Sequence, residues 1–168
     1  VTILARVRIR SEEEVAALEA EQQQKQQRQP MSFEHADPGN LGALLSVHQS
    51  IGVAQPLKTF GTEEIKKKYL PRCAAGEISA FALTEPGVGS DPARMLTTVV
   101  KTPDAAAYIL NGKKLWTTNG TLAKLLVVMA MDPGTKKIST FVVEADWPGV
   151  SVEHRCRFMG LRAISNAV

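Results

Sequence analysis

The spacing of hydrophobic positions between residues 37 and 76 predicts two helices. At the start of the first, Asp37-Pro38 has the form of an N-cap followed by proline at the first helical position. Downstream, apolar side chains and one histidine recur at helical spacing and form a single stripe: Leu41, Leu44, Leu45 and His48. Gly52 and Pro56 limit this helix. The histidine of this stripe is interpreted as a packed core residue.

The second helix of this stretch has signals at both of its ends. Thr62 can cap the start, the acidic residues 63–64 lie at the positive end of the helix dipole, and the lysines 66–68 lie toward the negative end. Pro71 is expected to end the helix. The three lysines could bind a phosphate, but a solvated helix face is the simpler interpretation.

From Ile78 onward, short apolar runs alternate with turn residues, a pattern that is typical of strands. The segment Tyr108–Trp116 is interpreted as a β-hairpin, because Asn111-Gly112 lies between two strand-like runs. Further strands are predicted at Phe81–Leu83, Leu122–Met131 and Ile138–Glu144 and from Gly149 to His154, with a turn at 132–137. The expected fold class is α+β, with a helical segment followed by an antiparallel, barrel-like or sandwich-like sheet.

The first 30 residues differ from the rest of the chain in composition. Residues 21–30 are dominated by glutamine, and no large apolar residue follows Leu18 before Met31. A solvated helical or disordered arm is the favoured interpretation, and a Gln-rich segment that binds a partner is the alternative. The start carries no secretory signal, and the acidic residues 12–14 argue against a transit peptide.

The overall composition narrows the class of protein. The chain has 168 residues, of which 44% are hydrophobic and 22% charged, as in globular proteins. Without a run of about 18 apolar residues, no transmembrane segment is expected. The net charge of +3 is not gathered into a stripe, so no nucleic-acid partner is expected either. Cys73 and Cys156 are interpreted as free thiols in a reducing compartment, with one bridge as the alternative, so an intracellular location is expected.

The segment Phe81–Asp91 has the most unusual residue pattern in the chain. A strand-like start runs into Pro86, Gly87 and Gly89, with hydroxyl and carboxyl side chains on both sides. Glycines at alternate positions let successive N–H groups point into one concavity, which suits a phosphate or pyrophosphate. The segment matches neither a Walker loop nor the GxGxxG motif. Taken alone, it is more simply a structural turn.

A second candidate segment combines a large aromatic ring with hydroxyl groups. Trp116 is followed by Thr117 and Thr118, and the run ends in the turn Asn119-Gly120. A flat aromatic cofactor could stack on the indole while a hydroxyl reaches its heteroatoms. The alternative is a tryptophan that packs at the mouth of a barrel.

Other kinds of chemistry find little support in the sequence. His35, His48 and His154 are scattered and have no partners at ligand spacing, so no metal site is expected. No Gly-x-Ser-x-Gly elbow supports a hydrolase triad. Glu85 and Asp91 could form a carboxylate pair, but they are more simply residues whose side chains bond nearby backbone N–H groups.

Taken together, the two segments resemble the acyl-CoA dehydrogenase family. The resemblance rests on Leu83–Asp91 and Leu110–Gly120, and it extends from about His35 to Val168. Additional motifs occur in the family's order: His48–Gly52, Phe60–Lys66, Tyr69–Pro71, Gly76-Glu77, Phe141–Glu144, Pro148-Gly149 and Met159–Arg162.

This resemblance implies a specific reaction and a set of partners. The family catalyses FAD-dependent α,β-dehydrogenation of an acyl-CoA thioester to the trans-2-enoyl-CoA. A carboxylate removes the α-proton, the β-hydrogen leaves as hydride to the flavin, and the electrons pass to an electron-transferring flavoprotein. A homo-oligomer is implied for the full-length protein.

The resemblance also assigns site residues by position. The first FAD-binding segment would comprise Phe81, Ala82, Leu83, Thr84, Glu85, Pro86, Gly87, Val88, Gly89 and Ser90. Within it, Thr84 would bond the flavin ring, and Ser90 would meet the pyrophosphate or bind the acyl-CoA substrate. In the second segment, Trp116 would lie against the isoalloxazine, with Thr117 beside it and Thr118 near the reactive nitrogen.

The same resemblance divides the chain and limits what it can do. Residues 31–77 would be the C-terminal part of a helical N-terminal domain, and residues 78–168 most of a central β-domain without its last strand. The family's catalytic glutamate sits in a C-terminal helical bundle, so no residue here is assigned as the base and the chain alone is expected to be inactive. The alternative is a non-catalytic module that binds flavin, acyl-CoA or another protein.

Overall fold

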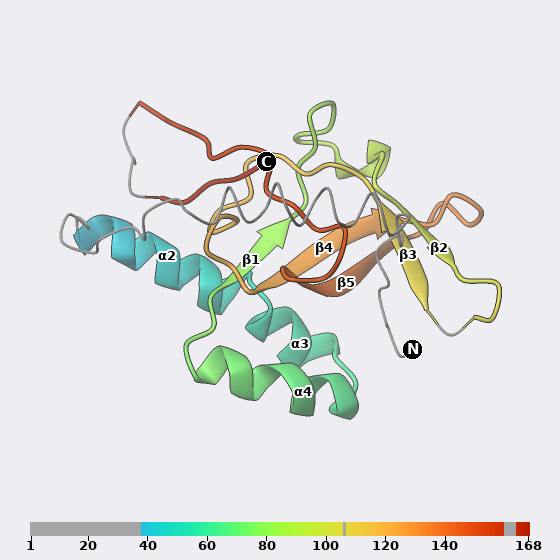
Figure 1. The fold of residues 1–168 in the computed structure, drawn as a ribbon, viewed down its shortest axis with the longest axis horizontal. Coiled ribbons are helices and arrows are strands. Elements are labelled where there is room, and N and C mark those ends of the chain that lie inside the picture. The colour runs from blue at the N-terminus through green and yellow to red at the C-terminus, as the bar shows by residue number, and fades with distance from the viewer. Residues whose placement is uncertain (1–37, 106, 160–163) are drawn as a thin grey trace.

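The computed structural model describes residues 38–105, 107–159 and 164–168 (Figure 1). The Gln-rich arm and the predicted cap at Asp37 lie outside these residues. In chain order, the helices are α2 (Pro38–Ser50), α3 (Ala54–Phe60) and α4 (Glu63–Ala74), and the short 3-10 helix η2 (Pro92–Arg94) follows β1. The strands are β1 (Ser79–Ala82), β2 (Thr98–Lys101), β3 (Tyr108–Asn111), β4 (Leu125–Met131) and β5 (Ile138–Glu144).

Three helices occupy the region where two were predicted, since α3 lies between the two expected helices, and both Pro56 and Pro71 lie inside helices. Pro56 falls in the first turn of α3, where its missing N–H is not needed for a hydrogen bond. Pro71 lies inside α4, which continues to Ala74 and ends where Gly76 adopts a φ of +98°. The predicted cap is confirmed, since the Thr62 hydroxyl accepts a hydrogen bond from the Ile65 N–H.

The strands form one mixed sheet with the order β1-β4-β2-β3, and β5 pairs with β4. The α+β class is confirmed, but the sheet is not purely antiparallel. Strand β4 runs parallel to β1, its last residue pairs in parallel with the first residue of β2, and it is antiparallel to β5. The turns in the sequence predicted only the pairing of consecutive strands, whereas β1 and β4 are joined by a long connection. The described strands do not close into a barrel.

The hairpin predicted across Asn111-Gly112 is wrong. Strand β3 ends at Asn111 and pairs backward with β2, so the hairpin turn lies between Lys101 and Tyr108. A Cβ on Gly112 would lie 2.7 Å from the Thr97 backbone, which shows how closely the chain passes over that residue. The strand expected from Gly149 is also absent, since the described residues there contribute only the isolated bridge Arg155–Ala167.

The turn at 132–137 is confirmed and connects β4 to β5. The Asp132 N–H donates to the Lys137 carbonyl at 2.9 Å, and Lys136 has a φ of 58°. The Asp132 carboxylate accepts from the Gly134 N–H at 2.8 Å and from the Thr135 N–H at 3.3 Å. These bonds lower the pKa of Asp132.

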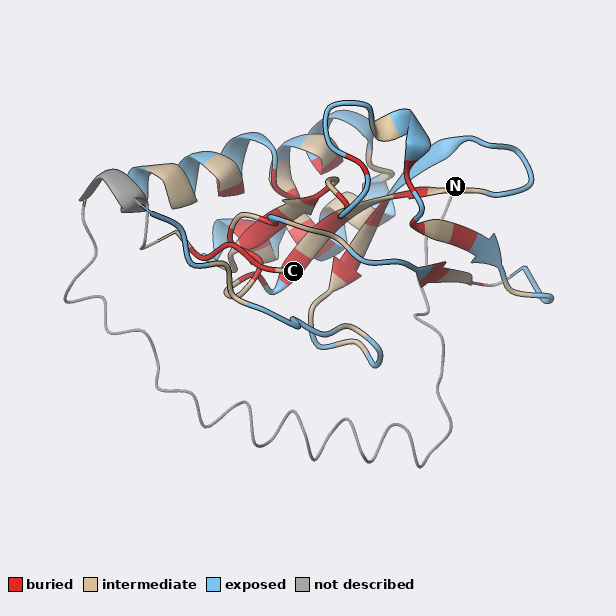
Figure 2. Ribbon diagram, turned by 90° about the horizontal axis from the view of Figure 1, so that it is seen from above, coloured by how far each residue is buried: buried red, intermediate tan, exposed pale blue. Residues whose placement is uncertain are grey.

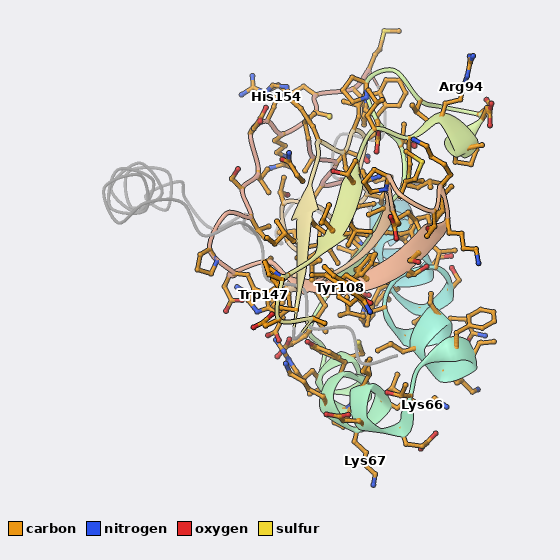
Figure 3. The ribbon with its side chains drawn as sticks, turned by 90° about the vertical axis from the view of Figure 1, so that its right-hand side faces the viewer. Lys66, Lys67, Arg94, Tyr108, Trp147 and His154 are labelled. Atoms are coloured by element: carbon orange, nitrogen blue, oxygen red, sulfur yellow. The ribbon has the colours of Figure 1, made fainter. Side chains whose placement is uncertain are left out.

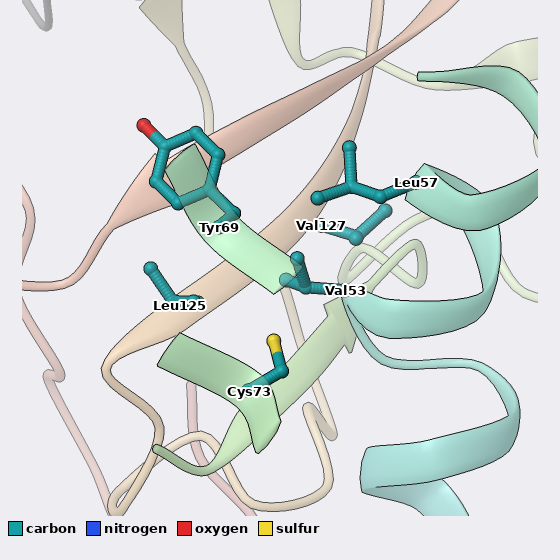
Figure 4. Packing of buried hydrophobic residues seen from close by; sticks show 6 residues of the cluster. All are labelled: Val53, Leu57, Tyr69, Cys73, Leu125 and Val127. Atoms are coloured by element: carbon teal, nitrogen blue, oxygen red, sulfur yellow. The ribbon is translucent and has the colours of Figure 1, made fainter. Parts of the chain in front are cut away.

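Buried side chains form two clusters, one on each face of β4. Figure 2 shows that buried residues are concentrated along the strands, whereas the outer surface of the helices is exposed. Leu125 and Val127 face the helices, whereas Leu126, Val128 and Ala130 face the other cluster, as expected for a strand buried on both sides. Figure 4 shows the helix-facing residues of β4 packed against side chains from α3, its N-cap and α4. The side chains from the helices are Val53, Leu57, Tyr69 and Cys73. The opposite cluster contains Val99, Leu110, Ala130, Phe141 and Val143.

The contact between α4 and β5 also contains a cluster of charged groups centred on Glu144. This carboxylate accepts from the Tyr69 hydroxyl at 3.0 Å and the Arg72 guanidinium at 2.6 Å, and it pairs with the Lys68 ammonium at 3.0 Å. Burial raises the pKa of Glu144, but hydrogen bonds from Arg72, Lys68 and Tyr69 outweigh burial and lower it. Arg72 pairs with Glu77 as well.

The three lysines of α4 are not a uniform solvated face. Lys66 pairs with Glu63 at 3.0 Å and Lys68 with Glu144, whereas Lys67 extends away from the body of the protein (Figure 3). Both cysteines are free, and Cys73 is buried. Among the described residues, no helix is long and apolar enough to cross a membrane.

Candidate functional site

The loop after β1 is a tight turn whose backbone is held in place while its tip faces solvent. Glu85 and Val88 exchange two backbone hydrogen bonds of 3.0 Å, which close the turn over Pro86 and Gly87. Val88 is buried under the loop, and Gly87, Gly89 and Ser90 are exposed. Neither glycine has a heavy atom within 4 Å of an added Cβ, so a molecule can approach the tip of the loop closely.

Glu85 is the buried anchor of this loop. Only 3% of its surface is exposed. Its carboxylate accepts from the Leu96 N–H at 2.6 Å, the Thr97 N–H at 3.0 Å and the Lys114 ammonium at 2.8 Å. Burial raises the pKa of Glu85, but these bonds outweigh burial and lower it to about 2. The carboxylate therefore stays ionised and engaged.

The two predicted segments lie side by side. The Leu115 N–H donates to the Thr84 carbonyl at 2.7 Å, and Lys114 donates to the Leu83 carbonyl at 3.1 Å. Trp116 follows directly with a φ of 55°, a backbone conformation that a bulky residue rarely adopts. Its side chain is 59% exposed although the residues around it are packed. Trp116 thus follows directly after a residue bonded to the Thr84 loop, and its indole is exposed to solvent.

The turn after Trp116 is tied to the C-terminal segment. Thr117 and Ala167 exchange backbone hydrogen bonds of 2.9 and 3.0 Å, and the Thr118 hydroxyl donates to the Asn166 side chain at 3.1 Å. Asn119 is fully buried with a φ of 65°, and its amide donates to the Leu44 carbonyl at 3.2 Å and the Ser79 carbonyl at 3.3 Å. These bonds fix the turn against α2 and β1.

His48 joins the same buried network, as its predicted place in the core requires. Its Nδ1 accepts from the Ser79 N–H at 3.0 Å and lies 2.8 Å from the Ser79 hydroxyl. That hydroxyl accepts in turn from the Val53 N–H at 3.0 Å. Gly52 is required here because a Cβ at this position would lie 2.2 Å from the Ser79 hydroxyl. The network therefore positions α2 against the sheet.

The predicted site residues divide into packed and accessible groups. Phe81, Ala82, Val88 and Thr117 contribute to the core, and Leu83 and Thr84 are half-buried. Pro86, Gly87, Gly89, Ser90 and Trp116 are exposed, and Thr118 is half-buried. Lys114, Asn119 and Asn166 were not predicted, because no local pattern marks a residue whose partners lie 29 to 75 positions away.

Glu85 and Asp91 do not form a carboxylate pair, because other partners engage each of them. The Asp91 carboxylate accepts from the Ala93 N–H at 3.1 Å and caps η2, whereas Glu85 bonds Leu96, Thr97 and Lys114. Within the described ranges, no group of three or more His, Cys, Asp or Glu residues could hold a metal ion. The arrangement instead offers an aromatic surface beside hydroxyl and amide donors, which suits a flat ring linked to an anion.

Comparison with known proteins identifies the family of the chain. Residues 80–167 match the family model described as acyl-CoA dehydrogenase, middle domain, and residues 30–77 match acyl-CoA dehydrogenase, N-terminal domain. Probable acyl-CoA dehydrogenase FadE10 of Mycobacterium tuberculosis is 63% identical over 133 residues, covering 77% of this chain and 20% of that protein. The human mitochondrial very long-chain specific acyl-CoA dehydrogenase is 42% identical over 136 residues, covering 76% and 21%.

A solved structure gives the same result for the fold. The acyl-CoA dehydrogenase complexed with FAD from Bacillus anthracis superposes with a TM-score of 0.72 at 40% sequence identity. The match covers 76% of this chain and 22% of that one. The chain thus spans about a fifth of the length of the relatives it matches. By family model and by relatives, the chain belongs to the acyl-CoA dehydrogenase family.

Proposed function

We propose that this chain supplies part of the FAD site of an acyl-CoA dehydrogenase. Membership of the family and the FAD-bound structural neighbour support this proposal. The observation that carries it is the exposed indole of Trp116, which is held in a rare backbone conformation beside the loop that contains Thr84.

The residues present fit the chemistry of FAD. Among the described residues, the Thr84 and Ser90 hydroxyls and the N–H groups of Gly87, Gly89 and Ser90 have no hydrogen-bond partner. Hydroxyls can bond the carbonyl and nitrogen atoms of a flavin ring, and N–H groups in a glycine turn suit a pyrophosphate. The indole supplies the flat apolar surface on which an isoalloxazine can stack.

Each accessible residue then has a proposed role. Thr84 bonds the flavin ring, Trp116 lies against it, and Ser90 meets the pyrophosphate or the acyl-CoA. Thr118 lies near the reactive nitrogen, and its hydroxyl is oriented by the bond to Asn166. The packed members of the two segments, such as Ala82 and Thr117, shape the backbone from the core side.

The proposed reaction is the α,β-dehydrogenation of an acyl-CoA thioester to the trans-2-enoyl-CoA. Bound FAD supplies the two-electron oxidation, and the residues described here bind and orient. Glu85 is not the base, because three donors engage its carboxylate and its pKa of about 2 makes it a poor proton acceptor. We assign no base among the described residues.

The partners proposed for the whole protein follow from the family. They are the acyl-CoA substrate, an electron-transferring flavoprotein and further copies of the same protein. The proposed location is the cytoplasm in a bacterium or the mitochondrial matrix in a eukaryote. These assignments belong to a protein of which this chain matches about a fifth of the length.

A titration of FAD into the chain, followed by quenching of flavin fluorescence, tests the site. Trp116→Ala should weaken FAD binding by about tenfold or more, since it removes the stacking surface. The control Trp147→Phe changes the only other tryptophan in the sequence. Trp147 packs against the buried cluster that contains Val99 and Phe141, so its replacement should leave FAD binding unchanged. Unchanged affinity in Trp116→Ala would refute the assignment.

A second measurement separates an enzyme from a binding module. The longest natural polypeptide that contains this sequence is loaded with FAD and mixed with acyl-CoA without oxygen. Bleaching of the flavin absorbance is expected if the protein dehydrogenates acyl-CoA. Bound FAD that no acyl-CoA bleaches would support the non-catalytic alternative.

A further inference from the structure

Lys114 is a lysine whose ammonium group lies inside the protein. Only 11% of its side chain is exposed, and its partner Glu85 is 2% exposed by the same measure. Removing two charges from water is costly and is tolerated only when geometry and further hydrogen bonds are good. Both conditions hold here, because Lys114 also bonds the Leu83 carbonyl and Glu85 also bonds two backbone N–H groups.

The lysine joins the two segments on which the proposed flavin site depends. Lys114 bonds Glu85 and the Leu83 carbonyl, and the adjacent Leu115 bonds the Thr84 carbonyl. These three bonds run between the Thr84 loop and the residues immediately before Trp116. They therefore link the backbone of the Thr84 loop to the backbone that leads into Trp116.

The chain around Lys114 is shaped for this contact. A Cβ on Gly112 would lie 2.7 Å from the Thr97 Cα, so only glycine lets the chain pass this close to Thr97, whose own N–H bonds Glu85. The neighbouring Lys113 points to the surface instead, where its side chain is 51% exposed and pairs with Glu153. Two adjacent lysines therefore differ in burial, partner and expected role.

We propose that Lys114 and Glu85 are positioning residues that hold the Thr84 loop and Trp116 in the arrangement that binds FAD. The proposal rests on the proposed function of the site. Neither residue needs to touch the cofactor, because both act through the backbone of the segments that do.

The test compares Lys114→Met, Glu85→Gln, the double variant and the matched control Lys113→Met in the full chain. FAD affinity and the free energy of unfolding are measured for each. Lys114→Met should weaken FAD binding about tenfold, whereas Lys113→Met should not change it. Since the single variant leaves a buried carboxylate without its cation, the double variant serves as the stable species.

The double variant separates positioning from a purely structural role. It removes both charges, so its stability should recover relative to Lys114→Met, while FAD affinity should stay low because the link to Leu83 and Glu85 is still missing. Recovery of both properties together would overturn the proposal.

A third readout needs no cofactor. In a Trp147→Phe background, Trp116 is the only tryptophan, and its fluorescence anisotropy decay reports how firmly the indole is held. The double variant should show a larger fast component than Lys113→Met, and equal decays would overturn the proposal. Failure of the wild-type chain to bind FAD would refute the proposed function, whereas equal FAD affinity in wild type and Lys114→Met would refute the positioning role alone.

Discussion

Two carboxylates in this chain are surrounded by donors, and they differ in what those donors are. Glu85 is bonded by two backbone N–H groups and one buried lysine, all from loops next to the candidate site. Among the described residues, the Glu144 carboxylate is bonded only by side chains of α4, namely Lys68, Tyr69 and Arg72. The first carboxylate therefore shapes local backbone, and the second attaches a helix to the edge of a sheet.

The difference teaches where each charge has its effect. Backbone donors are fixed by the path of the chain, so loss of Glu85 should disturb the loops that carry Thr84 and Trp116. The partners of Glu144 include Lys68 and Arg72, which are 53% and 30% exposed and can be partly solvated when the carboxylate is removed. Glu144 should therefore contribute to stability with little effect on the site.

The largest expected effect is the loss of stability in Lys114→Met. The uncompensated Glu85 carboxylate should lower the free energy of unfolding by about 3 kcal/mol, as removal of one partner of a buried ion pair usually does. Lys113→Met removes only an exposed pair and should cost no more than about 1 kcal/mol. Urea unfolding of both variants measures the difference, and equal costs would mean that Glu85 is not held as a buried charge.

Acid titration should reveal the same Glu85 carboxylate through the pH dependence of stability. The pKa of Glu85 in the folded chain is about 2, below its ordinary value of 4.5. Its stabilising contribution is thus complete above pH 4.5 and is lost as the pH falls toward 2. Relative to Glu85→Gln, the wild type should lose up to about 3 kcal/mol across this window. A pH-independent difference in urea unfolding between the two proteins would contradict the lowered pKa.

A smaller effect is expected from Glu144→Gln. The amide still accepts one hydrogen bond from Tyr69 or Arg72, so the cost should be about 1.5 kcal/mol. Glu77→Gln, which removes a more exposed partner of Arg72, should cost about 0.5 kcal/mol. FAD affinity should not change in either variant. A weakened FAD affinity in Glu144→Gln would show that Glu144 also affects the site, contrary to the distinction drawn between the two carboxylates.

The same contrast explains how much of the site could be predicted from the sequence. The loop at 81–91 and the segment at Trp116 stand out because glycine, proline and clustered hydroxyls constrain the backbone locally. Lys114 carries no such signal, since its partner is 29 residues away and a lysine in a polar run resembles any surface lysine. Its role depends on burial, which a single sequence does not encode locally.

The fold shows a similar limit. Strand β5, the turn before it and the cap of α4 were predicted because their signals are local. The parallel pairing of β1 with β4 was missed because it joins strands 46 residues apart in register, Ser79 with Leu125. Pro56 and Pro71 were interpreted as stops, but Pro56 lies in the first turn of α3, where proline is tolerated, and α4 continues past Pro71 to Ala74.

A last prediction tests whether α4 and Glu144 act as one unit. Thr62→Ala removes the side-chain cap of α4 and should cost about 1 kcal/mol in urea unfolding. The control Thr59→Ala loses only a bond to the Gln55 carbonyl within α3 and should be nearly neutral. Because α4 presents Lys68, Tyr69 and Arg72, Thr62→Ala should couple with Glu144→Gln in a double-mutant cycle and be additive with Glu85→Gln. Additivity in both cycles would show that the cap and Glu144 stabilise the chain independently. The distinction between a carboxylate that attaches a helix and one that shapes a loop would then rest on Glu85 alone.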